Sequence, residues 1–131
     1  WWGDTHPFKS SLTGQTAAEL CKMYTDETGE QFHAGLGFKH ANIEVVIDVL
    51  KRAQTLNKEE LLKAIAETDM DTIVGHIKYN DQHFSEIPVT IGQWQKGEKW
   101  PYEIVIFSNT KIPEVPLSDK KVIFPLPGST R

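Results

Sequence analysis

The sequence predicts a mixed α/β chain in which three helices precede a strand, a hairpin and an extended tail. Apolar residues recur at helical spacing in three consecutive segments of the first half, and β-rich segments alternate with polar turns in the second half. Helices that come before the first strand have no obvious sheet of their own to cover. We therefore expect the chain to be one part of a larger α/β fold.

The composition is typical of a globular domain. The 131 residues are 39% hydrophobic and 24% charged, with a net charge of −4 and no basic run longer than a pair. Because polyanions bind to clustered positive charge, this composition argues against a nucleic-acid partner. No apolar run reaches the roughly 18 residues that a membrane span requires. Cys21 is the only cysteine, so an internal disulfide is excluded.

The first expected helix spans 16–28. Thr16 and Glu19 have the spacing of a capping box, in which each side chain satisfies a free amide of the first turn. Gly29 supplies a left-handed stop. One face of the helix is apolar and consists of Ala17, Leu20, Cys21 and Tyr24. Because Cys21 lies on that face, we expect a packed and inert thiol.

A possible short strand at 32–36 precedes the second expected helix, 38–54. This helix is apolar around most of its circumference, which indicates that a neighbouring layer covers it. Its polar strip consists of Glu44, Asp48, Lys51 and Arg52. We expect these side chains to be solvated, with salt bridges to a neighbouring lobe as the alternative for Glu44 and Asp48.

The second half alternates turns with β-rich segments. Asn57 predicts the N-cap of a third, shorter helix at 58–68, and a strand is expected at 72–79. Two β-rich runs around the polar turn 96–99 predict a hairpin at 89–107.

The last segment, 110–131, is rich in proline. Prolines at 113, 116, 125 and 127 exclude regular structure there beyond a short strand near 122–124. We therefore expect an extended Pro-rich tail that wraps the surface.

Four short motifs mark the ends of these elements. The second helix ends in LKRA at 50–53, and the third reads AIAETD at 64–69. The predicted strand contains VGHIKY at 74–79, and QWQKG at 93–97 lies in the hairpin. In order and spacing, these motifs and the earlier run PFKSSLTGQTAAEL resemble the type I periplasmic solute-binding proteins of ABC importers. The resemblance is to the C-terminal portion of the branched-chain amino-acid receptor branch and covers almost the whole chain.

This resemblance implies a two-lobed α/β protein that closes on a small solute. Residues 1–36 would end the second lobe, with a cleft loop, the first helix and the possible short strand. Residues 37–109 would return to the first lobe and the hinge, and 110–131 would form the tail. The N-terminal part of the same protein, which supplies most ligand contacts in this family, would complete the fold.

Residues 1–6, WWGDTH, would then form the loop that leaves a second-lobe strand toward the cleft. Trp1 and Trp2 either wall a ligand pocket or fill core or lobe-interface space. Asp4 and His6 either hydrogen-bond a polar group of the ligand or cap a turn.

His40 stands near the expected start of the second helix, where members of the family often carry an aromatic residue that faces the ligand. Because the partial positive charge of a helix N-terminus repels a proton, we expect a neutral imidazole that donates a hydrogen bond to a carboxylate or carbonyl. The alternative is a structural histidine. Phe38 would supply an apolar wall beside it.

No pattern indicates catalysis. The five histidines show neither HxxxH nor HxH spacing, and the sequence has no phosphate-binding loop and no nucleophile elbow. We therefore expect a binding protein without enzymatic activity, metal or cofactor.

The function implied by the resemblance is that of the extracytoplasmic solute-binding component of an ABC transporter. It would capture an amino acid, amide or carboxylate between two lobes by hinge closure and deliver it to a membrane permease. The expected location is the periplasm, or the outside of the cell with a membrane anchor at the missing N-terminus. The alternative is a ligand-sensing domain of a signalling or regulatory protein with the same fold.

Overall fold

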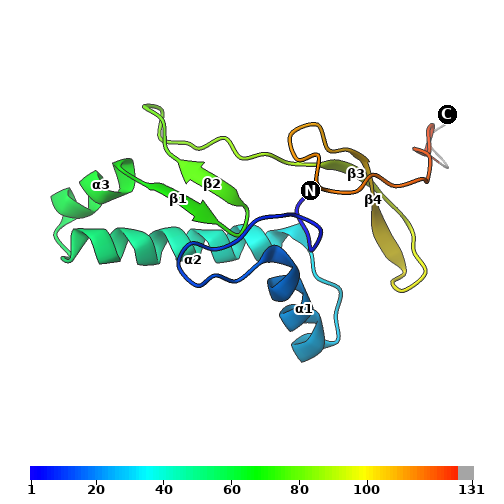
Figure 1. Cartoon of the computed structure of the whole chain (residues 1–131), viewed down its shortest axis with the longest axis horizontal. Coiled ribbons are helices and arrows are strands. Elements are labelled where there is room, and N and C mark those ends of the chain that lie inside the picture. Colours follow the sequence, from blue (N-terminus) through cyan, green and yellow to red (C-terminus); the bar gives the residue numbers. More distant parts are fainter. Residues whose placement is uncertain (127–131) are drawn as a thin grey trace. The chain divides into compact units, whose positions relative to one another are not determined.

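The computed structural model describes residues 1–126 and is a mixed α/β structure, as the sequence predicts (Figure 1). Its helices are α1 (Ala17–Thr28), α2 (Ala34–Ala53) and α3 (Lys58–Ala66). Its strands are β1 (Asp69–Thr72), β2 (Gly75–Lys78), β3 (Ile91–Lys96) and β4 (Tyr102–Ser108), which pair as the antiparallel hairpins β1–β2 and β3–β4. None of the helices within residues 1–126 combines the length and apolar character needed to cross a membrane.

The chain forms two compact units. The helical unit, Trp2–Pro88, contains the three helices and the hairpin β1–β2. The hairpin unit consists of Trp1 and the chain from Val89 onward, and it contains β3–β4. The sequence predicts a boundary between two lobes after residue 36. These lobes belong to a larger protein, so the boundary stays a prediction.

Helix α2 is the central element of the helical unit, since α1, α3 and β1 all contact it. Figure 1 shows α3 and the hairpin β1–β2 beside this long helix. Their apolar faces form one core, whose buried members are Trp2, Ala17, Leu20, Cys21, Ala41, Val45, Val49, Ala64, Met70, Ile73, Val74 and Ile77.

The ends of α1 and the start of α3 confirm the predicted caps. The Thr16 side chain accepts a hydrogen bond from the Glu19 amide, and the Glu19 carboxylate accepts one from the Thr16 amide at 2.8 Å. Gly29 ends α1 in the left-handed region at φ 71°. Asn57 caps α3 by accepting hydrogen bonds from two amides of its first turn. Local side-chain chemistry therefore positions these helix ends.

The start of α2 differs from the prediction, because the helix begins at Ala34 and no strand forms at 32–36. Two glycines, Gly35 and Gly37, disfavour a helix in this stretch by intrinsic propensity. Gly37 is nevertheless buried directly under the indole ring of Trp2, where a Cβ atom would lie only 2.5 Å from the ring. Packing against Trp2 therefore extends the helix through residues that the sequence pattern assigns elsewhere.

The single strand expected at 72–79 is two strands joined by a tight turn at Ile73 and Val74. Thr72 pairs with Gly75 in the register, and its hydroxyl donates to the Gly75 carbonyl at 2.7 Å. Gly75 has φ 118°, a conformation that residues with a Cβ rarely adopt. The apolar turn was not recognisable as a turn because it carries β-branched residues and is buried in the core.

The hairpin unit contains the hairpin predicted at 89–107. Strands β3 and β4 pair from Ile91↔Ser108 to Lys96↔Tyr102, with one irregularity after Ile91. The turn between them is held by the Glu103 carboxylate, which accepts from the amides of Trp100 and Lys99 at 3.2 and 3.1 Å. These amides, Trp100 first, lower the pKa of the Glu103 carboxyl.

The tail lacks helices and strands from Asn109 to Leu126, as predicted, but the short strand near 122–124 does not form. The backbone of Ile123 is hydrogen-bonded by the Gln93 side chain instead of by a neighbouring strand. Gln93 donates to the Ile123 carbonyl at 3.0 Å and accepts from the Ile123 amide at 2.9 Å. Ile112 and Val115 anchor the earlier part of the tail by burial. The final part of the predicted tail, 127–131, lies outside the described residues.

Candidate functional site

The six residues predicted as a ligand site have different surroundings in the structure. Trp1 belongs to the hairpin unit, where its ring meets that of Trp94 edge-on at 5.1 Å. Asp4 is exposed. His6 is 4% exposed, and its Nδ1 atom accepts a hydrogen bond from the Gly3 amide at 3.2 Å. His6 therefore takes part in a local turn at the start of the helical unit.

Trp2 lies in the core, which is one of the two alternatives predicted for it. Its side chain is 2% exposed, and the indole N–H donates to the Ile73 carbonyl at 2.7 Å. The other side of the same peptide turn is held by α2, since Glu44 Oε2 accepts from the Ile73 amide at 3.0 Å. Trp2 and Glu44 thus clamp the tip of the hairpin β1–β2 from both sides.

The position of Glu44 corrects the prediction of a solvated strip. Glu44 is 3% exposed, and its Oε1 atom has no hydrogen-bond partner among the described residues. Asp48 and Arg52 do form part of a polar face, and they pair with each other at 2.7 Å. The burial of Glu44 could have been predicted from its position in the sequence. Glu44 lies three residues after buried Ala41 and so shares the core-facing side of α2.

His40 does not lie at a helix N-terminus, because α2 begins six residues earlier, at Ala34. The expected effect of the helix end on its imidazole therefore does not apply, since that effect is confined to the first turn. Phe38 is partly buried and packs against the core of the helical unit. It does not line the pocket that contains His40, where an apolar wall was predicted. Of the six predicted residues, His40 lines a pocket on the surface of the helical unit.

This pocket, which we call the α1–α2 pocket, has a volume of about 390 Å³. It is lined by Tyr24, His33, Leu36, Lys39, His40 and Ile43. The α2 members recur at helical spacing and face Tyr24 of α1 and His33, the residue that precedes α2. The Tyr24 and His33 rings meet edge-on at 6.3 Å. The lining combines nitrogen donors with apolar surface, which suits a small polar solute with an apolar body.

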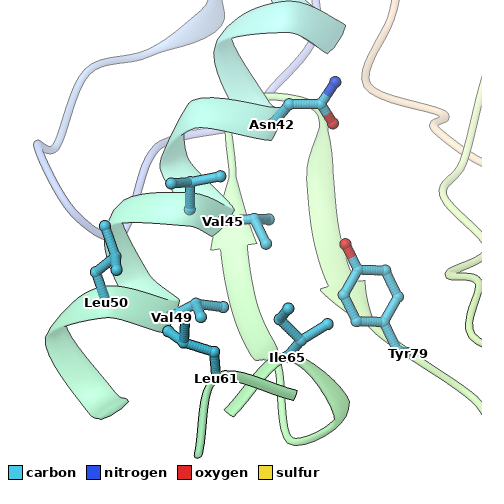
Figure 2. Close-up of a pocket in the computed structure, with 8 residues that line it drawn as sticks. Asn42, Val45, Val49, Leu50, Leu61, Ile65 and Tyr79 are labelled. Atoms are coloured by element: carbon cyan, nitrogen blue, oxygen red, sulfur yellow. The ribbon is translucent and has the colours of Figure 1, made fainter. Parts of the chain in front are cut away.

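A second hollow, the apolar groove, lies between α2, α3 and the end of β2 (Figure 2). Its volume is about 410 Å³, and its lining is Asn42, Val45, Val46, Val49, Leu50, Leu61, Ile65 and Tyr79. In Figure 2 the aliphatic side chains of α2 face Ile65 and the ring of Tyr79 across it. Polar groups for catalysis or for orienting a charged ligand are scarce in this groove, so it is a surface for apolar contact.

The outer face of α2 continues this apolar surface. Ile43 and Val46 are 59% and 51% exposed, and Leu50 is 41% exposed. Exposed apolar side chains grouped on one helix face are unusual in an isolated domain and are typical of contact surfaces. The neighbouring layer expected from the sequence is therefore not supplied by the helical unit itself.

The hairpin β1–β2 carries a charged cluster that the sequence pattern did not reveal. The two ring nitrogens of His76 lie 3.0 Å from Asp69 and 2.8 Å from Asp71, and Lys78 lies 2.5 Å from Asp69. The hydrogen bond from Lys78, assisted by His76, lowers the pKa of the Asp69 carboxyl. The cluster pairs charges across the two strands, because Asp69 and Asp71 of β1 face His76 and Lys78 of β2.

The single cysteine is not an available nucleophile. Cys21 is buried as expected, and burial raises the pKa of its thiol to about 12, so the thiolate is not populated near neutral pH. Within residues 1–126, no three side chains of His, Cys, Asp or Glu are grouped as metal ligands.

Comparison of the chain with family models, with curated proteins and with solved structures found no match. The resemblance to solute-binding proteins stays a prediction that rests on the four motifs and their spacing. The candidate binding surfaces of the helical unit are therefore the two hollows and the exposed face of α2.

Proposed function

We propose that the chain is the C-terminal portion of an extracytoplasmic solute-binding component of an ABC importer. It captures a small organic solute, such as an amino acid, amide or carboxylate, between two lobes. The observation that carries the proposal is the exposed apolar face of α2, formed by Ile43, Val46 and Leu50. A long helix with one face in its own core and the opposite face apolar requires a second layer, which the remainder of a two-lobed α/β protein supplies.

The placement of the motifs supports this proposal. LKRA forms the last residues of α2, and AIAETD spans the end of α3 and the start of β1. VGHIKY covers the buried turn and β2, while QWQKG covers β3 and the start of the next turn. Each motif therefore lies where an element ends, as expected when a family shares its connections.

The proposed mechanism is a population shift between open and closed lobes. A solute that contacts both lobes binds the closed state better, and it stabilises that state by the difference in affinity. The helical unit contributes the α1–α2 pocket, which contains His40. The remaining contacts come from the part of the protein that covers the apolar face of α2.

The test is a thermal-shift screen of the full-length protein against amino acids, their amides and small carboxylates, with neutral sugars as the matched control panel. A true ligand at 100 times its Kd adds about 2.7 kcal/mol to the stability and raises the Tm with concentration. The proposal fails if no solute raises the Tm.

A second measurement addresses the missing layer. The 131-residue chain alone should associate, because it exposes the apolar face of α2. Gel filtration with intact mass decides the point. A dilute monomer with one cooperative unfolding transition would show that α2 needs no further layer.

A further inference from the structure

The α1–α2 pocket gathers nitrogen groups that have no partner within the described part of the chain. Within residues 1–126, the side-chain nitrogens of His33, Lys39 and His40 make no hydrogen bond or ion pair. On the same unit, Lys22 pairs with Asp26, Arg52 with Asp48 and Lys78 with Asp69. The pocket therefore presents donors that remain available to a ligand.

No carboxylate lines this pocket. Glu30 contacts its lining from outside, since the Tyr24 hydroxyl donates to Glu30 Oε2 at 3.3 Å. Lys39 contributes an ammonium group with three donors, and each imidazole donates at least one hydrogen bond. A negatively charged head group would therefore meet one fixed positive charge and two further donors inside about 390 Å³.

The rest of the lining is apolar. Leu36 and Ile43 lie about two helical turns apart on the same face of α2, on either side of Lys39 and His40. Across from them stands the Tyr24 ring, which offers a flat apolar surface. This arrangement gives an anionic head and a compact apolar body separate places to bind.

We propose that the α1–α2 pocket binds a small organic carboxylate, with the carboxylate at Lys39, His40 and His33 and the apolar body against Leu36, Ile43 and Tyr24. The inference rests on the proposed function for its biological role, because it names the chemical class of solute that this side of the protein recognises. The site itself is defined by residues of one unit and can be tested directly.

The experiment is a titration of the full-length protein with benzoate, followed by NMR of the assigned histidine ring carbons at constant pH and ionic strength. The resonances of His33 and His40 should shift and saturate, whereas His76 and His83, which lie outside the pocket, serve as internal controls. Benzamide has the same ring without the charge, and it should bind at least roughly tenfold more weakly, since it forfeits the charge-assisted contacts.

Two matched variants locate the charge. Lys39→Gln should weaken benzoate binding roughly tenfold, because it removes one charge-assisted hydrogen bond. Lys51→Gln removes a lysine from the same helix outside the pocket and should leave the affinity unchanged. Both side chains are exposed, so both variants should fold.

Three results would overturn the inference: equal binding of benzamide and benzoate, shifts that do not saturate or that include His76 and His83, or an unchanged affinity in Lys39→Gln. The outcome is distinguishable from that of the proposed function. A solute that stabilises the full-length protein without moving His33 and His40 refutes the anion site and leaves the solute-binding proposal intact. Saturable benzoate binding with no stabilising solute in the screen supports the anion site and refutes the solute-binding proposal.

Discussion

Replacing Gly37 with alanine should destabilise the helical unit, although alanine is the better helix former. The added Cβ atom would lie 2.5–2.6 Å from three ring atoms of Trp2. The ring cannot retreat, because it is 2% exposed and its N–H is hydrogen-bonded to the Ile73 carbonyl at 2.7 Å. Either the helix or the indole must therefore move, at the expense of the core.

The magnitude follows from two opposing contributions. Overpacking a well-filled core costs about 1–3 kcal/mol, while alanine gains up to about 1 kcal/mol over glycine within a helix. With three contacts far below normal van der Waals separation, we expect a net loss of about 2 kcal/mol. For a unit of this size, the Tm should fall by roughly 10 °C.

The assay is urea unfolding followed by the helical circular dichroism signal, since all three helices belong to the helical unit. Gly35→Ala is the matched control: its Cβ would approach only the His33 ring, at 2.9 Å, and this exposed side chain can rotate away. Gly35→Ala should therefore be neutral or slightly stabilising, by less than about 1 kcal/mol. If Gly37→Ala unfolds at the same urea concentration as Gly35→Ala, the argument from Trp2 is wrong.

A double-mutant cycle isolates the contact. In a Trp2→Phe background the smaller ring leaves room, so Gly37→Ala should cost less than it does in the natural sequence. We expect a coupling free energy of about 1 kcal/mol or more between the two positions. Additive effects would show that the two side chains do not meet.

Three further predictions use the same unfolding assay or its pH dependence. Glu44→Ala should cost about 1–3 kcal/mol, because it leaves the buried Ile73 amide without an acceptor, whereas Glu44→Gln retains an acceptor and should cost less. Because the pKa of Asp69 is lowered in the folded state, its ionised carboxylate contributes to stability above pH 3.8, and this contribution is lost as the pH falls further. Asp69→Asn should therefore reduce the acid sensitivity of the urea midpoint. Cys21, with a pKa of about 12, should resist alkylation at neutral pH in the folded chain and react once urea unfolds it; equal rates would refute its burial.

Several features of the fold follow from residues that are neighbours in sequence. The capping box of Thr16 and Glu19, the left-handed stop at Gly29 and the cap at Asn57 all form as predicted. The hairpin β3–β4 also forms where two β-rich runs flank a polar turn. These signals are local: each partner lies within a few residues, so the sequence alone contains the whole interaction.

Other features needed partners that lie far apart in the sequence. The extension of α2 to Ala34 depends on Trp2 packing over Gly37, and the buried turn at Ile73 depends on Trp2 and Glu44 holding its peptide groups. Only the tertiary structure joins these segments, and it reverses the local preference of glycine and the usual exposure of glutamate.

The candidate site divides in the same way. The sequence singled out His40 as a residue able to hold a carboxylate, from its expected place at a helix start and from the resemblance to solute-binding proteins. The tertiary structure decided the surroundings: it moved the helix start away from His40, buried Trp2 and His6, and brought Tyr24 and His33 to the same pocket. The physical reason is that local hydrogen bonds set where a helix stops, whereas long-range packing sets which of its faces remains open to a ligand.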